Sequence, residues 1–214
     1  MKTKSLYKLI LFIFSPIIWA QESYDFEILI NGKPVGHYMT EVNTIDNEIH
    51  VTTDILIRIL FLFIPLFRLT NHSTERWVDN CLDNIRSLTS YGPRDYVVEG
   101  NVVEDNFIVR STRRGETTET ILESCPHALA FWSPDLLQIN EIINPFNGRN
   151  EEASFQDNEV IIESTDVIEK KLILDDDEFL LYYDSDGHWV GLKTTARNRL
   201  IEFVPSIQTL NKAN

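Results

Sequence analysis

The sequence predicts a mainly β protein, with a strongly curved antiparallel sheet or open barrel and one short helix. Apolar and polar residues alternate along many short segments, and tight-turn pairs such as Asn31-Gly32 and Asp186-Gly187 separate them. No repeat or low-complexity tract interrupts this pattern. Short alternating segments joined by tight turns are typical of antiparallel sheets.

The first hairpin has the clearest pattern. Residues 24–30 place four apolar side chains on one face at a period of two. Asn31-Gly32 follows, which is the strongest short signal for a hairpin turn. Residues 35–42 are therefore expected to return as the partner strand.

Residues 48–67 predict a strand that is amphipathic at its start and apolar on both faces at its end. From Ile49 onward the odd positions form a nearly unbroken apolar face, whereas the even positions begin polar and become apolar after Arg58. A strand that is apolar on both faces must be covered on both sides. The cover is ordinary core, which is the simpler interpretation, or a bound apolar ligand. Only nine uncharged residues separate Arg58 from Arg68, too few for a membrane span of ~20 residues.

The rest of the chain predicts further strands and one helix. Ser133 before Pro134 is typical of a helix start, so a short helix is expected from Pro134 to about Asn140, near the mouth of the curved sheet. The other strands are expected at residues 70–78, 81–91, 96–103, 107–113, 160–164, 167–174, 178–184, 188–197 and 200–204.

The N-terminus predicts export. Residues 1–8 are basic, residues 9–19 are apolar, and Ala20 precedes a polar stretch. This is the layout of a secretory signal peptide. We expect residues 1–20 to be removed, leaving residues 21–214 as one β-rich domain in the periplasm or secreted. An uncleaved N-terminal anchor helix is the alternative.

Cys81 and Cys125 are the two cysteines of the chain. Because an exported protein enters an oxidising compartment, a disulfide between them is the simplest prediction. A loop of this size could stabilise the fold by ~4 kcal/mol in the chain-entropy model. Two separate buried thiols are the alternative, because sequence does not show that the residues meet in space.

No sequence motif indicates catalysis. The chain lacks the common nucleophile, zinc-protease, phosphate-loop and dinucleotide signatures, and its five histidines show no metal-ligand spacing. In residues 71–77 we expect Glu75 to form a salt bridge with a neighbouring strand rather than to act in acid–base catalysis. The sequence therefore predicts no enzyme activity, no cofactor and no metal site.

A possible apolar ligand site combines the two-faced strand with aromatic residues before the predicted helix. Filling the core is the commoner role of such side chains. The candidate ligand-binding residues are Leu60, Leu62, Ile64, Leu66, Phe131 and Trp132.

Several segments together resemble a domain-of-unknown-function family of exported bacterial proteins. They are residues 24–38, 61–82, 125–137, 144–149 and 180–198. Both cysteines fall in such segments, and the family implies no activity. The chain is more distantly similar to half-barrel lipoprotein carriers of the envelope, in which a curved sheet wraps a hydrophobic hollow. That similarity is at the level of the fold, and fold does not establish function.

The net charge of −14 argues against binding to nucleic acid or to an anionic lipid surface. Our leading hypothesis is a non-enzymatic envelope protein that binds a lipid or acyl chain in a curved-sheet cavity. The alternatives are a structural or protein-interaction module of the envelope, and an enzyme whose site is assembled from distant residues.

Overall fold

The computed structural model describes residues 20–61, 64–161 and 167–206. Residues 1–19 of the predicted signal peptide and Leu62 therefore lie outside the described residues, as does most of the strand expected at 160–164. The side chain of Ile64 also lies outside the description.

The described residues form one sheet of fourteen strands, in the order β8-β7-β6-β5-β4-β3-β2-β1-β14-β13-β12-β11-β10-β9. Every strand pairs antiparallel with its neighbours. The strands are β1 (Ala20–Ile30), β2 (Lys33–Ile45), β3 (Glu48–Phe61), β4 (Ile64–Val78), β5 (Cys81–Tyr91), β6 (Arg94–Val103), β7 (Asn106–Arg113), β8 (Glu116–Leu122), β9 (Glu141–Ile143), β10 (Asn150–Ile161), β11 (Ile168–Leu174), β12 (Asp177–Tyr183), β13 (Trp189–Ala196) and β14 (Arg199–Pro205).

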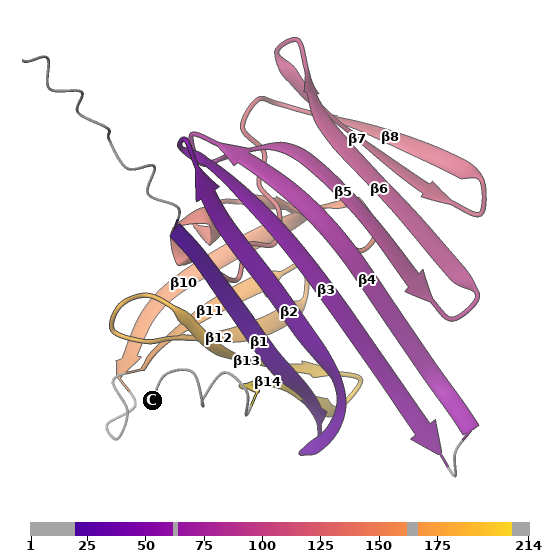
Figure 1. Ribbon diagram of the computed structural model, residues 1–214, viewed down its shortest axis with the longest axis vertical. Helices are drawn as coiled ribbons and strands as arrows, with labels where there is room; N and C mark the ends of the chain where they lie inside the picture. Colours follow the sequence, from indigo (N-terminus) through magenta and orange to yellow (C-terminus); the bar gives the residue numbers. More distant parts are fainter. Residues whose placement is uncertain (1–19, 62–63, 162–166, 207–214) are drawn as a thin grey trace, which may run out of the picture.

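The sheet curves over itself without closing. β1 pairs with both β2 and β14, so the two ends of the described chain meet in the middle of the sheet. β10 to β13 lie behind β1 to β4, and β8 and β9 are the two edge strands (Figure 1). The predicted curved, open antiparallel sheet is thus confirmed.

Two-residue turns set the register of this meander. Asn31 and Gly32 both have positive φ, as do Arg114 and Gly115 in the β7–β8 turn. Positive φ at both central positions gives the turn the twist that antiparallel strands require. The hairpin predicted at Asn31-Gly32 is confirmed, although β2 begins directly after it, at Lys33.

The core lies between the two halves of the curved sheet and is rich in aromatic rings. Trp189 of β13 is buried, and its ring centroid lies 4.4 Å from Phe26 of β1 and 5.2 Å from Tyr38 of β2. Phe131, from the connection between β8 and β9, lies 5.5 Å from the same ring. The core therefore joins strands from both halves of the chain.

The connection at residues 123–140 fills the concave side, and we call it the plug. The Tyr183 hydroxyl donates to the Phe131 carbonyl at 2.8 Å, and the Leu82 amide donates to the Pro126 carbonyl at 3.0 Å. The predicted disulfide between Cys81 and Cys125 is present and ties the plug to the start of β5.

The plug corrects the expected helix from Pro134 to Asn140. The structure has one turn of 3₁₀ helix, Pro134–Leu137, and Ser133 makes no side-chain capping bond. The segment instead folds to bury Leu136 and Leu137 beneath the sheet. Core contacts, rather than helix propensity, decide its conformation.

Candidate functional site

The structure does not bring the predicted ligand-binding residues together. Leu60 and Leu66 are 53% and 65% exposed near the β3–β4 turn, whereas Phe131 and Trp132 are buried in the plug. Trp132 packs against Trp77, which lies opposite Ile49 at the start of β3. Leu60 is eleven residues further along β3, roughly 36 Å at the rise of an extended strand.

Phe131 and Trp132 occupy core positions. Phe131 contacts Phe179 and Trp189, with ring centroids 6.1 Å and 5.5 Å away. The indole nitrogen of Trp132 is buried and has no hydrogen-bond partner in the part of the chain that the structure describes. Phe131 and Trp132 therefore help to hold the plug inside the curved sheet.

The far end of the β3–β4 hairpin carries an exposed apolar surface. We define the apolar tip as Ile59, Leu60, Leu66 and Phe67. β3 and β4 are 14 and 15 residues long, and their hairpin reaches beyond its neighbours at the lower right of Figure 1. Phe67 is supported by Tyr91 of β5, whose ring centroid lies 5.0 Å away. This apolar surface faces solvent rather than a cavity.

Basic residues surround the apolar tip, and together they form what we call the basic end. All are exposed, and none forms an ion pair with a described residue. Two open grooves of about 470 and 490 Å³ run between these cations and the tip. The cations are Lys33, Arg58, Arg68, Arg94, Arg197 and Arg199.

Arg58 and Arg68 are directly opposite each other on β3 and β4. Like charges in this arrangement destabilise a sheet. Asp95, which follows Arg94, accepts a hydrogen bond from Ser90 at 2.6 Å and forms no ion pair with the described residues. The arginines therefore retain their charge toward solvent.

The opposite ends of the same strands are acidic. Arg76 lies at this end and is bound by Glu48 and Asp83. The β1 to β6 half of the sheet therefore has one basic end and one acidic end. The acidic residues in or beside the turns are Asp46, Glu48, Asp79, Asp83, Glu104 and Asp105.

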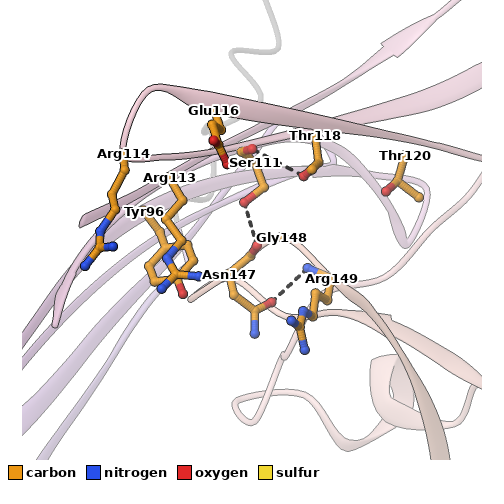
Figure 2. Close-up of a pocket in the computed structure, with 10 residues that line it drawn as sticks. All are labelled: Tyr96, Ser111, Arg113, Arg114, Glu116, Thr118, Thr120, Asn147, Gly148 and Arg149. Carbon is orange, nitrogen blue, oxygen red and sulfur yellow. Dashed lines mark hydrogen bonds between the residues drawn. The ribbon is translucent and has the colours of Figure 1, made fainter. Parts of the chain in front are cut away.

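A second candidate region is a polar hollow of about 600 Å³ between β6, β7, β8 and the turn before β10. Figure 2 shows Arg113 over the Tyr96 ring, 5.3 Å from its centroid, with Arg149 on the opposite wall. Glu116 is the carboxylate among the lining residues. Arg114 and several hydroxyl and amide groups complete the wall.

The turn at residues 144–149 is fixed against this hollow. Ser111 donates to the Asn147 carbonyl at 2.6 Å, and the Arg149 amide donates to the Asn147 side chain at 2.8 Å. Gly148 has a φ of +72°, and a Cβ there would lie 2.9 Å from the Ser111 Cβ. A larger residue would push the turn away from β7.

Glu75 differs from the expectation of a salt bridge to a neighbouring strand. It is buried, accepts a hydrogen bond from the Trp77 indole at 2.9 Å, and has no ion pair among the described residues. Burial raises its pKa from 4.5 to about 7, partly opposed by the Trp77 hydrogen bond. The neighbouring outward-facing His72 and Arg76 pair with Asp54 and Asp83.

Within the described ranges, no group of three or more His, Cys, Asp or Glu residues could hold a metal ion. The same part of the chain contains no helix with the length and apolar character needed to cross a membrane.

The fold and these surfaces define an open, curved β-sheet protein with a filled concave side and one basic, apolar end. The chain belongs to the family DUF6134, described as a domain of unknown function, whose model matches residues 26–206. The expected membership of a domain-of-unknown-function family is thus confirmed.

The fold is similar to that of a solved protein from Brucella abortus. That structure is described as a beta-barrel-like protein of domain of unknown function DUF1849. The TM-score is 0.59 at 8% sequence identity, over 89% of this chain and 96% of that chain. At this identity the similarity shows the fold alone. No curated protein matches the sequence.

Proposed function

We propose that this is a non-enzymatic envelope protein that binds lipid by docking its basic end onto an anionic lipid surface. The observation that supports this most directly is the placement of the exposed leucines Leu60 and Leu66 among six cations that form no ion pair with a described residue. Apolar side chains that enter the acyl region, with cations beside the headgroups, are a common basis of interfacial binding.

The lipid site in this proposal is the exposed end of the β3–β4 hairpin rather than a cavity inside the sheet. The plug occupies the concave side with buried side chains such as Leu136, Leu137 and Trp132. The grooves beside the tip are open and adjoin cations. This geometry suits an amphiphile with an anionic headgroup.

The distribution of charge favours one orientation at the surface. The acidic turns at the other end of β2 to β7 would be repelled by anionic headgroups while the basic end is attracted. Each cation near such a surface contributes ~1 kcal/mol, and burial of one leucine contributes roughly 1.5–3 kcal/mol.

The test is co-flotation of residues 21–214 with vesicles of phosphatidylethanolamine and phosphatidylglycerol, compared with phosphatidylcholine vesicles. We expect binding to the anionic vesicles that weakens with salt. The double variant Leu60→Asp/Leu66→Asp should bind at least tenfold less, because its tip can no longer enter the apolar region.

Leu88→Asp is the matched control, because Leu88 is 54% exposed but lies away from the β3–β4 turn, opposite His72. It should float as the unmodified protein does. Arg58→Gln/Arg68→Gln should lose binding to anionic vesicles only. Equal flotation of the Leu60/Leu66 and Leu88 variants, or no flotation of the unmodified protein, would contradict the proposal.

A further inference from the structure

The edge strand β8 has one side open for another strand. Among the described strands it pairs with β7 alone, and its side chains are almost all exposed. Arg113 and Glu116 flank the two-residue turn and are paired across it. Alternation along the ladder then directs the free N–H and C=O groups of Thr117, Glu119 and Ile121 to the open side.

Two hollows follow this strand along its length, and we call the space that they occupy the seam. The polar hollow of Figure 2 lies beside Thr118 and Thr120 and is bounded by residues 147–149. A second hollow of about 690 Å³ lies beside Ile121 and Leu122 and is bounded by residues 139–141. The seam thus runs between β8 and the β9–β10 hairpin.

The two ends of the seam differ in charge. Arg113, Arg114 and Arg149 line the first hollow, with Glu116 as the carboxylate among its lining residues. Glu123 and Glu141 line the second hollow. Glu151 in β10 lies near Arg149, and burial raises the pKa of the Glu151 carboxyl, which opposes its negative charge at the arginine end. A ligand in the seam would therefore have its negative charge at the arginine end.

We propose that the seam binds an extended peptide that adds a strand to β8 and places an acidic residue near Arg113 and Arg149. Regularly spaced main-chain groups give affinity in strand addition, while side-chain pockets select the sequence. Arginine is well suited to a carboxylate because its fork of donors can bind both oxygens.

A second copy of this chain fits the edge less well. In a symmetric antiparallel pair of β8 strands centred on Glu119, the two Glu119 side chains would lie opposite each other. Like charges in that position are destabilising. A separate acidic peptide, by contrast, matches the arginine end.

The first test is selection from a display library of random nine-residue peptides on immobilised residues 21–214. We expect enrichment of β-prone peptides with an acidic residue near one end. The enriched peptide should slow amide hydrogen exchange at Thr117, Glu119 and Ile121 by at least about tenfold. Failure to enrich a peptide, or binding without this protection, would overturn strand addition.

Two variants of one residue separate main-chain pairing from side-chain effects. Glu119→Pro removes the outward N–H at an edge position that tolerates proline, whereas Glu119→Ala keeps it. Both lose the contact of Glu119 with Arg110. We expect Glu119→Pro to bind the peptide at least about tenfold less tightly than Glu119→Ala. Equal affinities would contradict the proposal.

A third variant tests the charge. Arg113→Gln/Arg149→Gln should weaken binding roughly tenfold and reduce its salt dependence. Arg86→Gln, an exposed arginine on β5, should have no effect. Binding of dextran sulfate but of no peptide would instead identify a polyanion site and overturn the proposal. These outcomes do not depend on the vesicle experiment, because the seam and the basic end carry different variants.

Discussion

Glu75 is a buried carboxyl group whose ionisation the fold opposes. Its side chain is buried, and the Trp77 indole donates one hydrogen bond to it. Since burial raises the pKa of this carboxyl from 4.5 to about 7, the folded protein binds more protons than the unfolded chain between these values. The free energy of unfolding should therefore fall as the pH rises through this window, and level off above it.

Replacing Glu75 with Gln should reduce this pH dependence. The rise in the pKa of Glu75 corresponds to roughly 3 kcal/mol, and Glu75→Gln should gain most of this stability at pH 8 relative to pH 5. Glutamine also retains an oxygen that can accept the Trp77 hydrogen bond. Denaturant unfolding at both pH values measures the difference, with the exposed Glu99→Gln as control. Parallel pH profiles for all three proteins would contradict the assignment.

Glu75 also shows what sequence reasoning missed at the scale of single residues. The alternation correctly placed Glu75 on the face opposite His72 and Arg76. Trp77 lies two residues after Glu75, so alternation also places the indole that donates the hydrogen bond on the inner face. The sequence did not indicate that this face would be enclosed, because enclosure depends on the plug.

At the scale of elements, the disulfide joins the plug to the sheet. Cys81 begins β5, and Cys125 begins the segment that fills the concave side. Cys81→Ser/Cys125→Ser should lower the free energy of unfolding by about 2–4 kcal/mol, because the cross-link no longer restricts the unfolded chain. Chemical denaturation of the double variant, compared with the oxidised protein, measures this loss. An unchanged denaturation midpoint would show that the plug stays in place without the cross-link.

Residues 48–67, expected as one strand, instead form β3 and the start of β4, which pair antiparallel with each other. Three further strands were largely missed, and two of them lie at the edges of the sheet. β8 has polar residues on both faces, and β9 has only three residues. Most of β10 was also missed, since only residues from 160 onward were expected to be extended. An edge strand needs little apolar surface, so periodicity gives a weak signal there. The tight turn at Arg114-Gly115 was the available indication of a strand after β7.

At the scale of the whole molecule, the distribution of charge is more informative than its sum. A net charge of −14 predicts repulsion from an anionic surface. The sheet nevertheless collects six cations at its apolar end and acids at the other end. A local attraction can then exceed the long-range repulsion, since the potential decays within a Debye length of about 8 Å at physiological salt.

The proposed envelope role requires export of the whole protein. We expect the full chain to be processed after Ala20 and recovered from the periplasm or the medium with Gln21 as its first residue. Leu11→Arg/Ile13→Arg should interrupt the apolar run and leave the precursor in the cytoplasm. Cell fractionation and N-terminal mass spectrometry give the answer. Recovery of the unprocessed chain in the membrane fraction would favour the alternative of an anchor helix.

The sequence by itself determined the antiparallel β class, most strand positions and the tight turns. These features depend on local alternation and on a few residues with positive φ. Only the tertiary structure decided that the plug fills the concave side and that Leu60 lies far from Trp132. It also decided that cations from β2, β3, β4, β6 and the β13–β14 hairpin meet at one end. Such groupings depend on sheet curvature and on contacts between distant segments, which no local pattern encodes.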